Sequence, residues 1–398
     1  MLVTITKVMM KLSQRLLSID AFRAITMLTM IFVNDVSGVS NIPAWIEHVK
    51  ASEDGLGFAD IVFPAFLFIV GLSIPLAIGR RITRQESFLS TEWHIVVRSF
   101  AMIVMGFFHV NLESYSEGAL LPYAVWEILI TVSFFLIWLD YPETMNRTRK
   151  YLLMGTGIAL LLLMAFLYEG GTSEDPHWMR PSWWGILGII GWAYLVCATL
   201  YLLIKGRLAA LLVIYGIFLL INITNHGGWF TPDLWLIGDG GSVSLIMGGA
   251  VLTTLYIKLI KEGKRSSQMM LFTIVGVVMI AAGLALRPYT GGISKIHSTS
   301  AWILICSGIS VLVFNLMIWL VDVKGKMNWF SLIRPAGTST LTCYLIPYLL
   351  YAIFLLVHFR FPAILSEGIG GIIRSIAVAF AVILIVGWME KKKVRLKI

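Results

Sequence analysis

The sequence predicts an all-α, polytopic membrane protein with about twelve transmembrane helices and both termini in the cytoplasm. Two features of composition and one of charge placement indicate this class. Of the 398 residues, 58% are hydrophobic and only 13% are charged, and the mean hydropathy is +0.85. An average soluble domain has about 25% charged residues. A surface so poor in charge is stable against lipid, which does not penalise exposed apolar side chains.

Twelve apolar segments are spaced along the chain, and most approach the ~20 residues that a helix needs to cross a bilayer. They cover residues 19–36, 58–79, 95–110, 119–138, 151–168, 184–204, 208–223, 242–260, 269–286, 300–321, 337–357 and 369–388. The segments 95–110 and 208–223 are slightly short for a span. No soluble domain or low-complexity linker interrupts the series, so we expect one transmembrane domain over residues 1–398.

Positive charges are distributed as a twelve-span topology requires. With the N-terminus inside, the inner connections hold 23 of the 31 Lys and Arg residues, and no outer connection holds more than two. This asymmetry follows the positive-inside rule, and a wrong helix count would scramble it. The basic run at 391–397 is then a lipid-phosphate anchor, and no nucleic-acid partner is expected.

Charged and amide side chains interrupt the first apolar segment. Asp20 and Arg23 are three residues apart, which places them on one helix face where they can pair. Asn34 and Asp35 follow near the outer end. Ionisable groups within a span are costly and usually face the protein interior or a watery cavity. Asp20 and Arg23 therefore form either a structural ion pair or part of a site.

A second polar pair is expected at the outer surface. Asp60 lies just inside the second apolar segment, and His48 lies in the preceding loop on the same side. A carboxylate hydrogen-bonded to one imidazole nitrogen fixes the tautomer and makes the other nitrogen a better base. His48 is thus a candidate general base oriented by Asp60. The alternative is that His48 is one solvated loop histidine among several. No outer histidines have the spacing of a helical metal site, so no metal is expected.

These residues carry a resemblance to a known family. The sequence is similar to the membrane core of heparan-alpha-glucosaminide N-acetyltransferase and its bacterial relatives. The matching motifs are R-L-x-S-x-D-x-F-R at Arg15–Arg23, F-V-N at Phe32–Asn34 and, after His48, G-L-x-x-A-D-x-V-F-P at Gly55–Pro64. A second similar stretch covers residues 295–345, and the match between the two stretches is loose.

The resemblance implies an acyltransferase that moves an acetyl group from cytosolic acetyl-CoA to an amino sugar or glycan on the extracytoplasmic side. It maps the family's active-site histidine to His48, its nearby acid to Asp60 and its asparagine to Asn34, whose amide can stabilise an oxyanion. The resemblance also suggests a homodimer, and we expect the protein in a bacterial plasma (inner) membrane.

The nucleotide end of acetyl-CoA is anionic, and the inner side of the predicted topology is electropositive. Arg80, Arg81 and Arg84 follow the second apolar segment on that side. Guanidinium groups bind phosphates well, so these arginines are candidates for cofactor binding. The alternative is that they only anchor the helix at the inner surface.

The sequence departs from the family's pattern at two places, and the alternatives concern the acceptor and the class of function. The region 184–223 contains an additional helical hairpin, and a histidine of the family's penultimate helix is replaced at about Pro347. The Arg15–Asp20–Arg23 spacing is similar to that of membrane O-acyltransferases, so an O-acetyltransferase of surface polysaccharide is an alternative. A twelve-helix secondary transporter is the alternative from another class, although it predicts repeated halves, which the sequence does not display.

Overall fold

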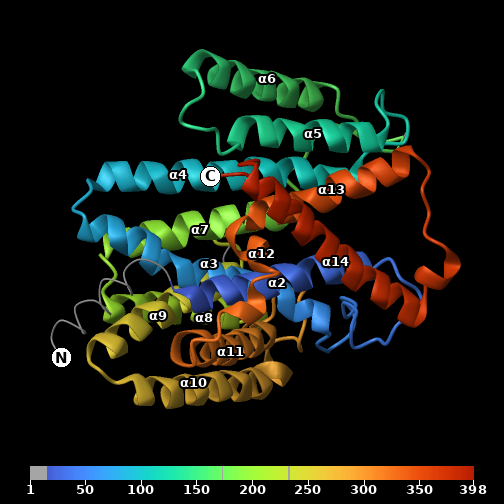
Figure 1. Ribbon diagram of the computed structural model, residues 1–398. Coiled ribbons are helices and arrows are strands. Elements are labelled where there is room, and N and C mark those ends of the chain that lie inside the picture. Colours follow the sequence, from blue (N-terminus) through green and yellow to red (C-terminus); the bar gives the residue numbers. More distant parts are fainter. Residues whose placement is uncertain (1–15, 173, 232–233) are drawn as a thin grey trace.

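The computed structural model describes residues 16–172, 174–231 and 234–398, and nearly all of its regular structure is helical (Figure 1). Arg15 of the first motif lies outside these residues. The long helices are α2 (Leu17–Val36), α3 (Phe58–Thr83), α4 (Phe88–Val110), α5 (Tyr123–Trp138), α6 (Arg147–Phe166), α7 (Gly185–Leu203), α8 (Leu208–His226), α9 (Gly241–Lys261), α10 (Arg265–Leu286), α11 (Ser300–Met317), α13 (Thr340–Leu356) and α14 (Gly368–Lys391), and α12 (Arg334–Thr338) is short. The two-residue strands β1 (Gly170–Gly171) and β2 (Pro176–His177) pair antiparallel in one loop.

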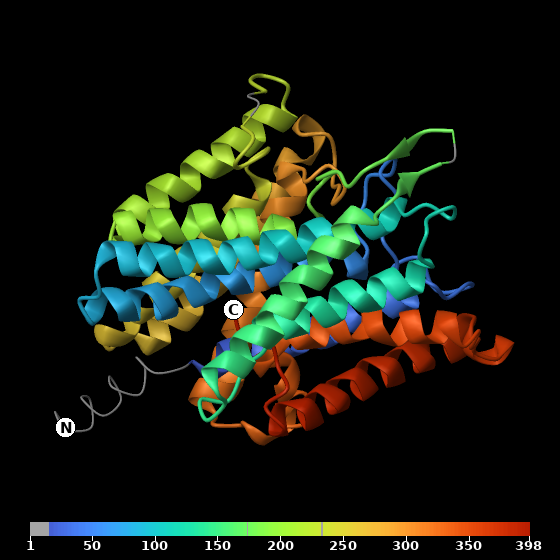
Figure 2. The ribbon, with the colours of Figure 1, turned by 90° about the horizontal axis from the view of Figure 1, so that it is seen from above.

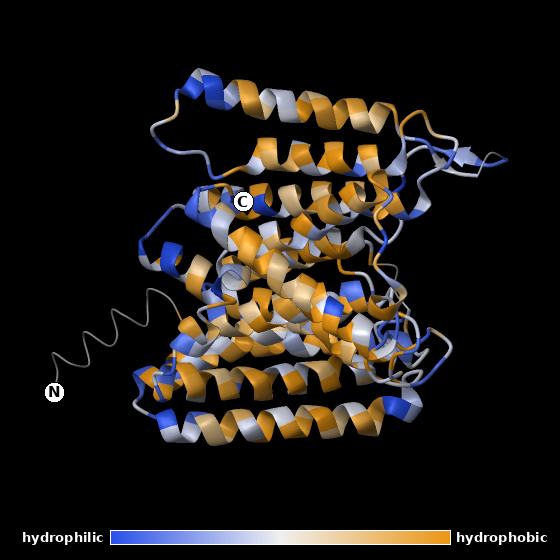
Figure 3. Ribbon diagram, turned by 45° about the vertical axis from the view of Figure 1, so that its right-hand side comes forward, coloured by the Kyte–Doolittle hydropathy of each residue, from blue (hydrophilic) through white to orange (hydrophobic). Residues whose placement is uncertain are grey.

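The fold is that of a multi-pass, all-α membrane protein. Within the described residues, ten helices are long and apolar enough to cross a membrane. The shorter apolar helices α5 and α13 occupy the places of the predicted fourth and eleventh spans. Figure 3 shows apolar residues along the middle of the bundle and polar residues gathered at its two ends. This distribution matches a slab of hydrocarbon between two aqueous faces.

The largest differences between the helices and the predicted segments are at the start of α4 and around Ser339. α4 begins at Phe88 rather than near 95, because the Ser87 side chain caps the helix by accepting a hydrogen bond from Ser90 N at 3.2 Å. The predicted segment 337–357 is divided at Ser339, where the backbone leaves the helical conformation between α12 and α13. The division lets α12 approach α2 closely, since a Cβ on Gly337 would lie 2.5 Å from Asp20 O.

Small residues bring the central helices together. α3 and α9 cross in backbone contact: a Cβ on Gly71 would lie 1.8 Å from Ile246 O, and one on Gly249 would lie 2.1 Å from Phe68 O. Membrane helices use glycines in this way because close approach maximises van der Waals packing where no hydrophobic driving force acts. By contrast, few side chains of α6, α8 and α10 are buried, so these helices lie on the outside of the bundle.

The connections that carry the predicted outer residues lie at one end of the bundle. The loop between α2 and α3 and the β1–β2 hairpin are both at the right-hand end in Figures 1 and 2. The loop between α10 and α11 meets the α2–α3 loop there, because Gly55 N donates to Ile293 O at 3.1 Å. Residues from distant parts of the chain are therefore brought together at this end.

Candidate functional site

The first site lies at the end of the bundle that was predicted to face outward, and it is called the outer site below. It is built around a buried carboxylate at the start of α3. Asp60 occupies the third position of this helix, and its Oδ2 accepts hydrogen bonds from Gly57 N at 3.0 Å and Val49 N at 3.1 Å. The first bond is the carboxylate half of a capping box. The other oxygen, Oδ1, lies 2.7 Å from His48 Nδ1. The Asp60 side chain is 2% exposed, so its position is fixed on every side.

This arrangement defines what the imidazole of His48 can do. With Nδ1 donating its hydrogen to Asp60, the lone pair of the neutral ring is on Nε2, which is the nitrogen that can accept a proton. The His48 side chain is 37% exposed, so a solute can reach it. It lines a small outer cavity of about 240 Å³ together with Val33, Val36, Ser37, Ile46, Glu47 and Ala59.

Lys295 is a third residue at this site, and the sequence counted it only as an outer charge. Its Nζ lies 3.3 Å from His48 Nδ1 and 3.4 Å from Nε2. It comes from the loop before α11, 247 positions away in the sequence. No local spacing could connect the two residues. The available signal was that Lys295 begins the second stretch of family resemblance.

Burial affects the charge of this lysine. Removal from water lowers the pKa of the Lys295 ammonium, and the nearby Asp60 carboxylate opposes that shift. Lys295 is half-buried, so its ammonium interacts more strongly with neighbouring charge than it would in open water.

Asn34 lies apart from His48. Its exposed side chain lines a larger outer cavity of about 670 Å³ between α2, α13 and α14. Asp35 in the same cavity is buried, bonds Tyr351 and Ser375, and pairs with Arg374 at 3.0 Å. Ser37 lines both this cavity and the smaller one beside His48, so the two cavities are neighbours.

Toward the other end of α2, which was predicted to face inward, Asp20 and Arg23 form the ion pair that their spacing predicted, with Arg23 Nη1 3.4 Å from Asp20 Oδ1. Arg23 also donates to Ser73 Oγ at 2.6 Å and to Gly337 O at 3.2 Å. It therefore joins α2 to α3 and to α12, and it forms part of a cavity wall.

The cavity that Arg23 lines is called the central cavity here. It has a volume of about 360 Å³ and is mainly apolar. Its cationic lining residues are Arg23, Arg98 and Lys397. Arg98 stacks over the Tyr194 ring at 5.2 Å, and its buried Nε has no hydrogen-bond partner among the described residues. Such an orphaned donor beside a cavity is suited to an anionic or carbonyl group of a ligand.

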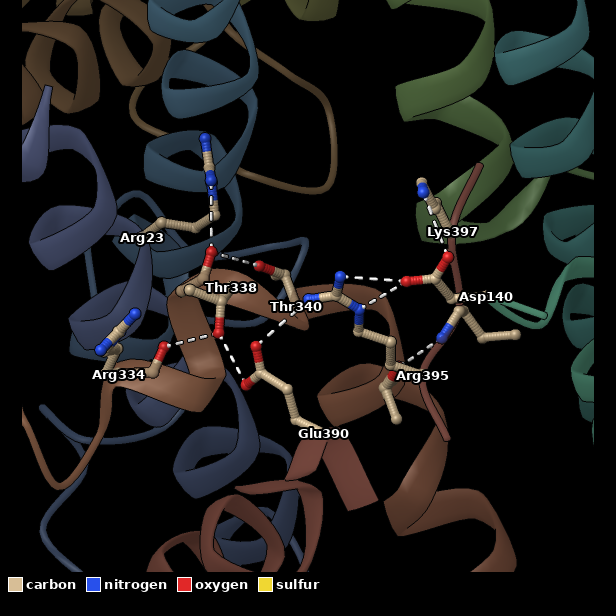
Figure 4. A network of polar contacts seen from close by, with 11 residues as sticks. Arg23, Asp140, Arg334, Thr338, Thr340, Glu390, Arg395 and Lys397 are labelled. Atoms are coloured by element: carbon tan, nitrogen blue, oxygen red, sulfur yellow. Dashed lines mark hydrogen bonds and ion pairs between the residues drawn. The ribbon is translucent and has the colours of Figure 1, made fainter. Parts of the chain in front are cut away.

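The last residues of the sequence form another wall of the central cavity. Figure 4 shows Asp140 between Arg395 and Lys397, at 3.0 and 3.1 Å. Burial alone would raise the pKa of Asp140, but these two cations hold it below its ordinary value. Leu396 N donates to Thr342 Oγ1 at 3.0 Å, which fixes the segment against α13.

Arg80, Arg81 and Arg84 are not in the described lining of the central cavity. Arg81 instead pairs with Glu86 at 2.5 Å, within the turn that follows α3. Cys197, Cys306 and Cys343 are free and buried. Among the described residues, no group of three or more His, Cys, Asp or Glu side chains could hold a metal ion.

Comparison with known proteins gives two findings. A family model described as a domain of unknown function, DUF5009, matches residues 15–226, which is just over half of the chain. Heparan-alpha-glucosaminide N-acetyltransferase of Homo sapiens is 41% identical over 110 residues, and that of Mus musculus is 38% identical over 109 residues. Each match covers 27% of this chain and 16% of the length of the relative.

Proposed function

The chain belongs to the family described as a domain of unknown function, DUF5009, and from that premise we propose that it is an acetyl-CoA-dependent acetyltransferase of the plasma membrane. Its donor is cytosolic acetyl-CoA, and its acceptor is an amino sugar or glycan on the extracytoplasmic side. The proposal includes a single domain of twelve spans with both ends inside, and a homodimer. The observation that carries it is the contact between His48 Nδ1 and Asp60, which makes Nε2 the nitrogen that can act as a base.

The chemistry of acetyl transfer suits this pair. His48 Nε2 takes a proton from the acceptor amine while the amine nitrogen forms a bond to the acetyl carbonyl carbon. The carbon–sulfur bond then breaks, and the thiolate of coenzyme A receives the proton that His48 had taken. Asp60 keeps its own charge throughout and stabilises the transient imidazolium. Direct transfer of this kind needs no acetylated residue.

The central cavity is the proposed donor site. Its volume of about 360 Å³ is within the ~300–1,000 Å³ usual for small-molecule sites, and its apolar walls suit the pantetheine arm. Arg98, with an unpartnered buried Nε, and Lys397 supply cations for the donor phosphates. In this proposal Arg98 and Lys397 bind the donor phosphates in place of Arg80, Arg81 and Arg84. The latter three then anchor the end of α3 at the inner surface of the membrane.

The donor cavity and the outer site share two helices. On α2, Met27 and Met30 line the central cavity, and Val33 lines the cavity beside His48. Three residues of helix rise by about 4.5 Å. An acetyl group at the outer end of the donor cavity would therefore be within about one helical turn of the outer site. This proximity supports direct transfer to an acceptor bound from outside.

Asn34 remains the proposed amide donor to the acceptor or to the oxyanion. Its place on the large outer cavity favours a role in holding the acceptor sugar rather than direct contact with His48. We expect Asn34→Ala to raise the KM for the acceptor more than it lowers kcat.

The test is acetyl transfer from radiolabelled acetyl-CoA to glucosamine and heparin-derived oligosaccharides, with purified protein in proteoliposomes. His48→Ala is compared with His177→Ala, which removes another outer histidine from the β1–β2 hairpin. Labelled product with the wild type and His177→Ala, but not with folded His48→Ala, supports both the reaction and its base.

Other outcomes separate the alternatives. A base-labile ester rather than an amide product would identify an O-acetyltransferase. If acetyl-CoA neither binds nor is hydrolysed, the acetyltransferase proposal is wrong and substrate transport becomes the function to test.

A further inference from the structure

Lys295 is placed at His48 by a network that joins three distant segments. Asp54 in the α2–α3 loop accepts hydrogen bonds from Ile293 N at 2.7 Å and from Arg287 Nε at 2.8 Å. These bonds fasten the loop before α11 to the loop that carries His48. The close fit needs glycine at position 292, where φ is +80° and a Cβ would lie 2.7 Å from the Asp54 carboxyl carbon.

The turn that carries Lys295 is also fixed from within. Ser294 N donates to Thr299 Oγ1 at 3.0 Å, and Ser298 N donates to Lys295 O at 3.1 Å. Directly afterwards, α11 begins, and its Trp302 Nε1 donates to Asp60 O at 3.1 Å. The segment that presents Lys295 is therefore tied to the same residue that orients His48. Such anchoring on both sides is what a preorganised site requires.

The charge of Lys295 is directed at the imidazole. Among the described residues, no carboxylate lies within ion-pair distance of its Nζ, and its polar contacts are the two nitrogens of His48. Lys50 on the same face provides a contrast, because its side chain is 81% exposed and lies 3.8 Å from Glu53. A lysine that only solubilised the outer surface would resemble Lys50.

We propose that Lys295 is a catalytic residue whose ammonium group stabilises the negative charge that develops on the acetyl carbonyl oxygen during transfer. This inference rests on the proposed acetyltransferase function. An acceptor amine must come within about 3 Å of His48 Nε2 to give up its proton. Lys295 Nζ is 3.4 Å from that nitrogen, so the carbonyl group under attack lies beside the ammonium.

The step balances without a proton from Lys295. As the carbon–nitrogen bond forms, the carbonyl π electrons move to oxygen, and the ammonium donates a hydrogen bond to that oxygen. When the carbon–sulfur bond breaks, the carbonyl re-forms and the hydrogen bond weakens. The contribution is largest in the tetrahedral state, so loss of the charge should lower kcat and leave KM nearly unchanged.

The test compares Lys295→Met, Lys295→Arg and Lys50→Met in the acetyl-transfer assay. Removing one oxyanion donor typically lowers kcat by about 10²–10³-fold, and we expect a loss of this size for Lys295→Met. Lys295→Arg should retain more activity because it keeps the charge. Lys50→Met should match the wild type, since its lysine does not contact the site.

A chemical restoration separates charge from packing. In Lys295→Cys, alkylation with 2-bromoethylamine rebuilds an ammonium side chain of nearly lysine length, whereas iodoacetamide adds a neutral group. The three native cysteines are at most 1% exposed, so treated wild-type protein is the control for selectivity. Activity should return with the ammonium and not with the neutral adduct.

Each outcome decides the inference. Equal recovery of activity with both adducts, or full kcat in Lys295→Met, overturns the role of Lys295. The proposed function would still stand in that case if the wild type transfers acetyl groups and His48→Ala does not. If the wild type transfers no acetyl group, the function fails and the inference falls with it.

Discussion

Asp60→Asn is the substitution for which the structure makes the sharpest prediction. The two carboxylate oxygens have different partners: Oδ2 accepts from the backbone N–H groups of Val49 and Gly57, and Oδ1 contacts His48 Nδ1. The carbonyl oxygen of an asparagine must take the place of Oδ2, because an amide NH2 there would face two donors. The NH2 group is then directed at His48 and donates to Nδ1.

This reversal changes the tautomer of His48. When Nδ1 accepts a hydrogen bond, the neutral ring carries its hydrogen on Nε2, which can no longer take a proton from the acceptor. General acid–base catalysis contributes about 10²–10⁴-fold, so kcat should fall by that factor, equivalent to about 3–5 kcal/mol in the barrier. The substituted side chain would keep both backbone hydrogen bonds, so the loss of folding stability should be only about 1–2 kcal/mol.

Steady-state acetyl transfer in proteoliposomes measures the fall in kcat, and thermal unfolding in detergent measures the loss of folding stability. Asp60→Ala is a poor substitute, since it leaves two buried N–H groups without acceptors and costs about 1–3 kcal/mol for each. If Asp60→Asn folds normally and keeps kcat within a few-fold of wild type, His48 is not a base oriented by Asp60.

Three further predictions concern the loops, the donor cavity and the topology. Hydrogen bonds from Ile293 N and Arg287 lower the pKa of Asp54, so its contribution to stability should be complete above the ordinary value of 3.8 and lost as pH falls through the lower folded value. The Tm difference between wild type and Asp54→Asn should shrink over that acidic range, and a difference that grows there would contradict the tether. The ion pair of Asp54 with Arg287 is half exposed, so its contribution to folding stability should be about 1 kcal/mol or less. Arg98→Gln should raise the KM for acetyl-CoA about tenfold or more, equivalent to losing one charged hydrogen bond of about 1.5–3 kcal/mol. The KM for the acceptor should not change. An equal rise in KM for both substrates would show that Arg98 does not belong to the donor site. Lys50→Cys should react with an impermeant maleimide on intact cells and Lys264→Cys only after lysis, and labelling of both on intact cells would refute the proposed topology.

The sequence was sufficient to predict the apolar helices and the pairs that lie close along the chain. Asp20 and Arg23 are three residues apart in one helix, and His48 and Asp60 are separated by one loop, so spacing and sidedness alone brought each pair together. Hydropathy cannot predict a local break in an apolar run, and the division at Ser339 was therefore missed. That break depends on the tertiary approach of α12 to α2.

Lys295 and Arg98 show what sequence reasoning could not reach. Lys295 meets His48 only because Asp54 ties two outer loops together, and neither hydropathy nor helix spacing contains that information. Arg98 lies within an apolar segment, and its role depends on which helix face borders a cavity. The predicted arginines after α3 satisfied the charge argument equally well, because positive charge near the inner surface serves both anchoring and anion binding.

The arrangement of the central cavity and the small cavity beside His48 has a mechanistic consequence. α2 lines both cavities. The ion pair of Arg23 with Asp20 fixes one half of this helix, and the ion pair of Asp35 with Arg374 fixes its other end. A donor held by its phosphates at the inner mouth and an acceptor bound at the outer face would meet without either crossing the membrane. In the proposed mechanism only the acetyl group would change sides, by bond exchange beside His48. Such a mechanism would need no alternating access.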